Sequence, residues 1–143
     1  MSDSKTRIFL VDDDALYLNL LKNDFLAQTD YIIETYATGE LCVENLSRKP
    51  DIIILDYFLD GIEKTAINGI EALDRIKLYD PNIPVVMLSC QDQIEVAVNC
   101  MHHKAYDYVV KSETAFMRLQ KIITDIVDYN KIAKELTWYM DRM

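Results

Sequence analysis

Five short apolar runs of strand length alternate along the chain with segments of helical periodicity, and this alternation is what most constrains the fold. The expected strands cover residues 7–11, 31–36, 51–55, 85–88 and 106–110. The third contains four consecutive aliphatic residues, Ile52–Leu55, a run typical of a strand that is buried on both faces. Strands that alternate with helices form parallel sheets through right-handed crossovers. We therefore expect an α/β fold with a doubly wound, five-stranded parallel sheet and five helices.

Each expected strand is followed by a helix with its own start signal. Asp14 is placed to cap the first helix and Thr38 the second, while later helices are expected at about 68–79, 93–102 and from 113 onward. Apolar residues recur at helical spacing at Leu16, Leu20, Leu21 and Phe25 in the first helix and at Ile94, Val98 and Met101 in the fourth. These positions are predicted to face the core.

Composition limits the kind of partner. The 143 residues are half apolar, enough for one domain with a real core, and the net charge is −9. This charge argues against direct binding to nucleic acid or to an anionic membrane, and it favours cations and basic protein surfaces. Residues 1–7 lead into a strand without a secretory apolar segment, so we expect a cytoplasmic protein. Cys42, Cys90 and Cys100 match no metal spacing and are expected to be small buried hydrophobes.

Polar residues stand at the points where four of the strands end. Asp12 and Asp13 follow the first strand, Asp56 the third, Ser89 the fourth and Lys111 the fifth. A single aspartate after a strand is usually a loop or cap residue, but parallel strands bring all these positions to one edge of the sheet. Three carboxylates there would repel one another unless a cation lay among them, and Mg2+ suits a few carboxylates with open positions for phosphate oxygens. The set therefore favours phosphoryl transfer with Asp56 as the nucleophile.

The segments VDDD, PDIIILD, PVVMLS and DYVVK, in this order, resemble the receiver domain of bacterial two-component response regulators, of the chemotaxis-receiver kind. The resemblance covers roughly Lys5 to Asp128. It implies a flavodoxin-like sheet with strand order 2-1-3-4-5. It also implies a signalling domain that takes a phosphoryl group from a sensor histidine kinase or phosphotransfer protein. Such a domain is not an enzyme toward other substrates, although it catalyses its own phosphorylation and dephosphorylation.

The same resemblance assigns the metal ligands. Asp56 would be the phosphoacceptor, and Asp13 and Asp56 would bind Mg2+ directly. The backbone carbonyl of Phe58 would be a further ligand, and Asp12 would hold the metal mainly through water.

The resemblance also implies a switch that reports phosphorylation. Ser89 matches the switch hydroxyl and Lys111 the phosphate-contacting lysine. Tyr108 matches the aromatic residue that swings inward when the hydroxyl moves toward the phosphoryl group. The output would be a changed protein-interaction surface around the fourth helix, fifth strand and fifth helix.

Three features depart from the family pattern. Ser112 replaces the proline that usually follows the lysine through a cis peptide, so the geometry around Lys111 is open. Lys104 stands where a glycine usually opens the turn before the fifth strand. The connection 57–68 is longer than usual. Two further residues, the bulky Phe58 and Gln91, occupy positions that tune dephosphorylation in the family.

The last helix is expected to run past the receiver. We divide the chain into a receiver domain, 1–128, and a helical extension, 129–143. Trp138, Tyr139 and Met140 would be unusual in an idle tail. The extension is therefore expected to pair with another subunit or to lead into an output domain. A homodimer through the fourth helix, fifth strand and fifth helix is the other possibility.

Two other functions fit parts of the pattern. A haloacid-dehalogenase-like phosphatase also uses a strand-end DxD, here Asp12 and Asp14, with Asp12 as its nucleophile and a later serine and lysine. A protein-interaction module that works without phosphorylation would need only the fold. Against the phosphatase, the chain is short, shows no cap insertion and has no further acidic pair after Lys111. The complete set of Asp13, Asp56, Ser89 and Lys111 favours the phosphoacceptor over the interaction module.

Overall fold

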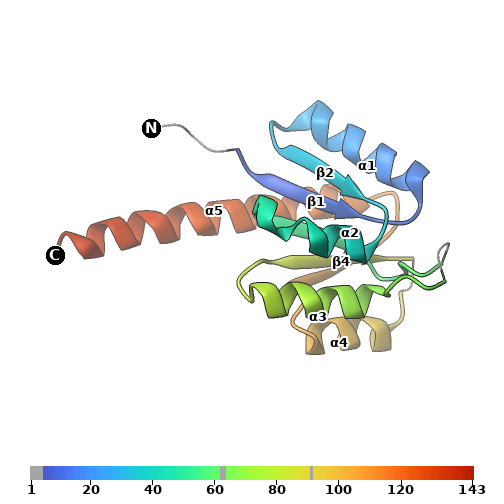
Figure 1. Cartoon of the computed structure of the whole chain (residues 1–143). Helices are drawn as coiled ribbons and strands as arrows, with labels where there is room; N and C mark the ends of the chain where they lie inside the picture. The colour runs from blue at the N-terminus through green and yellow to red at the C-terminus, as the bar shows by residue number, and fades with distance from the viewer. Residues whose placement is uncertain (1–4, 62–63, 91) are drawn as a thin grey trace.

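The computed structural model describes residues 5–61, 64–90 and 92–143. Within these ranges, strands and helices alternate along the whole chain (Figure 1). The elements are β1 Arg7–Val11, α1 Ala15–Gln28, β2 Ile32–Tyr36, α2 Gly39–Glu44, the 3-10 helix η1 Leu46–Arg48, β3 Ile52–Asp56, α3 Gly69–Tyr79, β4 Val85–Ser89, α4 Ile94–His102, β5 Asp107–Val110 and α5 Ala115–Asp141.

The five strands form one parallel sheet in the order β2-β1-β3-β4-β5, which confirms the expected fold class. In the centre, Ile54 pairs with Leu10 of β1 and with Val86 of β4. Every residue of β3 and β4 is buried, because helices cover both faces of the sheet. α2, α3 and α4 pack on one face and α1 and α5 on the other, each with its own hydrophobic cluster. The run Ile52–Leu55 is therefore the interior strand that its sequence predicted.

The buried face of α1 differs from the prediction. Leu18, Leu21 and Phe25 are buried, whereas Leu16 is 71% exposed and Leu20 is 56% exposed. The helix carries leucines on several sides, so spacing alone selects no face, and contact with the sheet decides. The prediction was right for Leu21 and Phe25 and wrong for Leu16 and Leu20.

The fourth helix is a second correction. Ile94, Val98 and Met101 are all exposed, and Cys100 is the residue of α4 that is buried. A short helix at the side of a sheet can bury a single residue and leave its apolar stripe on the surface. Among the cysteines, Cys42 and Cys100 are buried as expected, but Cys90 is exposed.

The structure shows the backbone conformation at Lys104 and Ser112, the two positions where another residue replaces a glycine and a proline of the family pattern. Lys104 takes the left-handed conformation, with φ 75°, at the turn before β5, where a glycine would adopt it without strain. The described residues contain no cis peptide bond, so Lys111 and Ser112 are joined by a trans bond.

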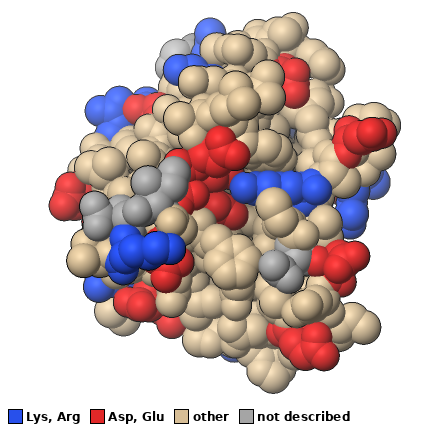
Figure 2. Space-filling model, turned by 90° about the vertical axis from the view of Figure 1, so that its right-hand side faces the viewer, with Lys and Arg blue, Asp and Glu red and all other residues tan. Residues whose placement is uncertain are grey.

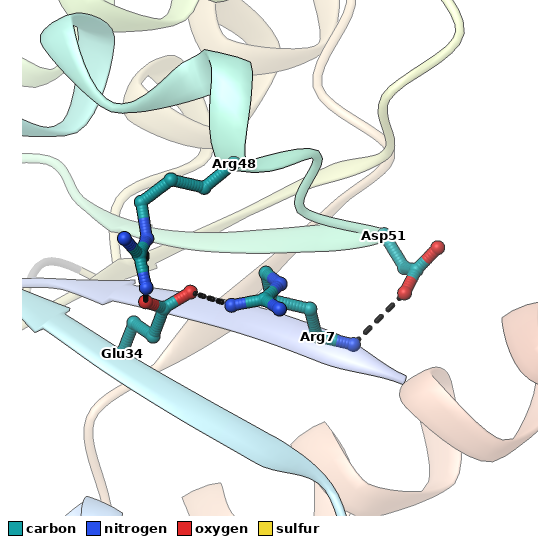
Figure 3. A network of polar contacts seen from close by, with 4 residues as sticks. All are labelled: Arg7, Glu34, Arg48 and Asp51. Atoms are coloured by element: carbon teal, nitrogen blue, oxygen red, sulfur yellow. Dashed lines mark hydrogen bonds and ion pairs between the residues drawn. The ribbon is translucent and has the colours of Figure 1, made fainter. Parts of the chain in front are cut away.

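A polar network ties together the end of the sheet opposite the strands' carboxyl ends (Figure 3). Glu34 of β2 accepts hydrogen bonds from Arg7 Nη1 at 2.5 Å and from Arg48 Nε at 2.7 Å. The backbone N–H of Arg7 donates to Asp51 Oδ2 at 2.8 Å. Burial raises the pKa of Glu34, but the hydrogen bonds from Arg48 and Arg7 outweigh it, and the pKa is lowered. The network joins β1, β2 and η1 to the start of β3.

α5 continues without a break well beyond the sheet and projects from the rest of the molecule (Figure 1). The expected boundary at residue 128 falls inside this helix and stays a prediction. None of the helices in the described ranges is long and apolar enough to cross a membrane.

Candidate functional site

The carboxyl edge of the sheet brings the polar residues predicted for the site close together. Asp12 and Asp13 follow β1, Asp56 ends β3, Ser89 ends β4 and Lys111 follows β5. Together with the loop after β3, the acids and the lysine line an open cavity of about 560 Å³. Figure 2 shows acidic side chains gathered beside a basic one near the centre of one face. Ser89 is fully buried at the same edge.

The three aspartates are arranged as metal ligands. Asp12, Asp13 and Asp56 each offer one carboxylate oxygen, and these oxygens lie within 4.8 Å of one another. Asp12 and Asp56 are each only 4% exposed. One buried oxygen of Asp12, Oδ2, already has a charged partner, Lys111 Nζ at 2.8 Å. A set of ligands made only of carboxylate oxygens fits a hard divalent cation.

Asp56 has an abnormal affinity for protons. Burial raises its pKa to about 7, the negative charge of Asp12 adds to the rise, and Lys111 opposes it. A hydrogen bond from the backbone of Phe58 also favours the charged form. The lysine alone therefore does not balance the acids around it, and a carboxyl with such a pKa is typical of functional sites.

Lys111 lies between the two buried acids. Its Nζ is 2.8 Å from Asp12 Oδ2 and 3.5 Å from Asp56 Oδ1. It also lies 4.6 Å from the centroid of the Tyr17 ring, in cation–π contact. Burial lowers the pKa of Lys111, but the hydrogen bond with Asp12 and the charges of Asp56 and Asp12 raise it overall. The ammonium is therefore held in its charged form beside the carboxylate of Asp56.

Sequence reasoning did not find Tyr17. It lies in the first turn of α1, directly after the acids that follow β1, and its backbone N–H is capped by Asp14. A helix that begins at the carboxyl edge of the sheet has its first turn beside the site. The position of Tyr17 in that first turn was therefore the signal in the sequence that could have identified it.

Ser89 and Tyr108 belong to adjacent strands and are in contact. Tyr108 pairs in register with Met87, and the backbone N–H of Lys111 donates to the Ser89 carbonyl at 2.8 Å. Burial raises the pKa of Tyr108, and a side-chain hydrogen bond with Ser89 partly offsets that rise. The hydroxyl and the tyrosine thus form one connected unit at the end of β4 and β5.

The long loop after β3 is held at several points. Leu59 is fully buried, and the backbone N–H of Ile67 donates to Glu40 Oε2 at 3.0 Å. Gly61 lies so close to the acids that a Cβ there would be 3.2 Å from Asp13 Oδ2. The loop therefore forms one wall of the site. Gln91, which occupies a position that tunes dephosphorylation in the family, lies outside the described residues.

Gly69 fixes the start of α3 beneath the site. A Cβ at this position would lie 2.5 Å from the backbone oxygen of Asp56 and 2.6 Å from that of Tyr57. Any larger residue would push the chain that carries Asp56 out of place, so the close approach requires glycine.

Comparison with known proteins agrees with this geometry. A family model described as the response regulator receiver domain matches residues 8–124. The nitrogen assimilation regulatory protein NtrX of Azorhizobium caulinodans is 37% identical over 106 residues, which are 73% of this chain and 22% of that protein. The chemotaxis protein CheY of Thermotoga maritima is 30% identical over 71% of this chain and 82% of its own length.

Solved structures show the same architecture. NtrX from Brucella abortus superposes with a TM-score of 0.78 and 26% identity, over 94% of this chain and 29% of that one. A CheY-like receiver domain protein from Methanospirillum hungatei superposes with a TM-score of 0.76, over 90% of this chain and 98% of that one. Because the two sequences are only 22% identical, this likeness supports the fold alone. The first curated relatives are longer proteins, of which this chain spans 21 to 29%. The chain belongs to the family of response regulator receiver domains, the phosphoacceptor domains of two-component signalling.

Proposed function

We propose that Asp56 accepts the phosphoryl group from a phosphohistidine on a sensor kinase or phosphotransfer protein. The observation that carries this is the burial of Asp56 between Asp12 and Lys111 on an open cavity. A carboxylate oxygen of Asp56 attacks the phosphorus, the O–P bond forms, the N–P bond breaks, and the imidazole leaves as the neutral base after proton uptake. Lys111 Nζ, 3.5 Å from Asp56 Oδ1, is placed to neutralise an oxygen of the incoming group.

Asp12, Asp13, Asp56 and the backbone carbonyl of Phe58 are the groups that would hold Mg2+. The oxygens of the three aspartates, within 4.8 Å of one another, support this assignment. When bound, Mg2+ supplies the positive charge that transfer of a phosphoryl group requires. Phe58 is 45% exposed at the mouth of the cavity, and its bulk is placed to limit the access of water to a phosphoryl group on Asp56.

The connected pair of Ser89 and Tyr108 would report the modification. The Ser89 hydroxyl moves toward the phosphoryl group, the hydrogen bond with Tyr108 changes, and the surface of α4 and β5 responds. That surface is apolar because α4 exposes Ile94, Val98 and Met101, none of which is covered by another described part of the chain. An effector or an output domain with a complementary apolar face is the partner that this surface fits.

The wider role that we propose rests on the site together with the net charge of −9. The chain would work in the cytoplasm, without direct contact to nucleic acid or membrane, as the phosphorylated partner of a kinase. It would catalyse its own phosphorylation and dephosphorylation and act on no other substrate.

The structure offers less to the phosphatase alternative. Its second acid would be Asp14, but Asp14 Oδ1 accepts hydrogen bonds from Leu16 N at 3.1 Å and Tyr17 N at 3.2 Å as the cap of α1. Asp14 also stands outside the cluster of acids that meet within 4.8 Å. The geometry therefore favours Asp56 over Asp12 as the nucleophile.

Intact-protein mass spectrometry with acetyl phosphate and Mg2+ tests the proposal. Wild type should gain one phosphoryl group, and Asp56→Asn should gain none. Retention of the label in Asp56→Asn with its loss in Asp12→Asn would support the phosphatase instead. A wild type that takes no label at all would support an interaction module.

A further inference from the structure

The part of α5 beyond Asp128 carries an apolar stripe on its surface. Tyr129, Ile132, Leu136 and Tyr139 are 56 to 72% exposed, and Met143 continues the series just past the helix. Their separations alternate between three and four residues, the spacing of a seam between two packed helices. An exposed stripe of this kind is stabilised when a second apolar surface covers it.

The distribution of charge along the chain indicates which partner covers the apolar stripe. The extension, residues 129–143, carries three basic and two acidic residues, a net charge of +1. Because the whole chain carries −9, residues 1–128 carry −10. Two extensions can therefore approach each other with little repulsion, whereas two receiver domains repel.

A groove lies at the base of the extension. This cavity of about 670 Å³ is lined by residues of α3, α4, α5 and the turn before β5, among them Met101, Lys104, Tyr106, Ile126 and Tyr129. Tyr129 belongs to both the groove and the stripe, so the two form one continuous apolar surface.

We propose that the extension packs antiparallel against the extension of a second copy, with Leu136 near the two-fold axis. Two heptads form a short seam, and the groove adds the contact that the seam lacks. In this orientation the end of the second helix, with Met140 and Met143, reaches the groove beside Tyr129. Lys104 on the groove wall is then placed near the negative end of that helix dipole.

Electrostatics selects the antiparallel over the parallel arrangement. A parallel pair places the two receivers side by side, each with a charge of −10. An antiparallel pair separates them along the axis by about 21 Å, the helical rise over the fourteen steps from Tyr129 to Met143. That separation exceeds two Debye lengths at physiological salt, about 8 Å each. It also brings the exposed Asp128 opposite Arg142 of the second copy.

Sedimentation equilibrium of the unmodified chain tests the pairing. We expect a dimer that Leu136→Lys and Ile132→Lys each weaken at least tenfold, whereas Lys134→Ala, outside the stripe, leaves it unchanged. Far-UV circular dichroism shows that the variants keep the domain fold. A wild type that stays monomeric up to about 100 μM, or a dimer that both stripe variants leave intact, overturns the proposal.

Cross-linking in a Cys90→Ser background tests the orientation. Tyr129→Cys chains mixed with Met143→Cys chains should form a disulfide between the two kinds of chain, and neither alone should do so. A disulfide between two Tyr129→Cys chains means a parallel pair and overturns the arrangement. Asp128→Lys and Arg142→Glu should each weaken the dimer severalfold, and the double variant should restore it.

Discussion

Two clusters of charged residues lie at opposite ends of the sheet and differ in the balance of positive and negative charge. At the carboxyl edge, three carboxylates share one ammonium, that of Lys111. At the other end, the carboxylate of Glu34 lies between the guanidinium groups of Arg7 and Arg48, and Asp51 accepts from the backbone N–H of Arg7. The pKa of Asp56 is raised to about 7, mainly by burial, whereas the pKa of Glu34 is lowered because its hydrogen bonds to two arginines outweigh burial.

The difference separates a structural cluster from a functional one. The network around Glu34 is satisfied by its own side chains and joins elements of the fold. The site around Asp56 keeps an excess of buried negative charge, which destabilises the chain until positive charge arrives from outside. Excess negative charge at an open cavity is therefore the property that suits a cation, and the cation together with Lys111 would supply the positive charge that a phosphoryl group needs.

The largest expected effect is on the pH dependence of stability without divalent cations. The pKa of Asp56, about 7 in the folded chain, lies above its ordinary value of 3.8, so the folded chain binds a proton that the unfolded chain has already lost between these values. The contribution of this proton to the free energy of unfolding is complete below about pH 4. It is lost as pH rises through about 7, where Asp56 ionises in the folded chain. At pH 8 we expect Asp56→Asn to be more stable than wild type by up to about 4 kcal/mol.

Urea unfolding of both proteins from pH 4 to pH 8 in EDTA measures this difference. Adding Mg2+ at pH 8 should stabilise wild type and leave Asp56→Asn nearly unchanged. The difference in free energy of unfolding between the two proteins should therefore decrease. Parallel pH profiles of stability for the two proteins would show that Asp56 has an ordinary pKa. They would contradict the excess of negative charge that we assign to its site.

A smaller effect is expected when the lysine of the site is removed. Lys111→Met leaves the buried Asp12 without its ion pair, and we expect a loss of about 3 kcal/mol in the free energy of unfolding at pH 8 without metal. Mg2+ should recover part of the loss, because it replaces the missing positive charge. The measurement is urea unfolding with EDTA and then with Mg2+, and a loss that Mg2+ leaves untouched would mean that Lys111 acts by packing alone.

The smallest effect is expected in the balanced network. Glu34→Gln should lower the free energy of unfolding by about 1 kcal/mol at pH 7, since its ion pairs are partly screened by solvent. The pKa of Glu34 is lowered from 4.5, so its contribution is present above that pH and is lost as pH falls through the folded-state value. Thermal unfolding at pH 7 and pH 3 checks both points. A loss as large as that of Lys111→Met would remove the distinction between the two clusters.

The sheet and the residues at its carboxyl edge were predictable because their signals are local. Ile52–Leu55 is apolar throughout because β3 is covered on both faces. Once that strand is parallel to its neighbours, the positions of Asp12, Asp56 and Lys111 at one edge follow from topology.

What the sequence did not predict depends on contacts between distant segments. Leu16 and Leu20 share α1 with other leucines, and only contact with the sheet decides which of them are buried. Tyr17 reaches Lys111 from a different strand–helix unit, and Gly61 approaches Asp13 through the fold of a long loop. No periodicity within one segment carries information about such pairs.

Peptide mapping of the chain after treatment with acetyl phosphate and Mg2+ tests the central claim most directly. We expect the phosphoryl group on the peptide that contains Asp56, with the label dependent on Mg2+. A label on Asp12, on a histidine, or on Asp56 regardless of Mg2+ would contradict the account.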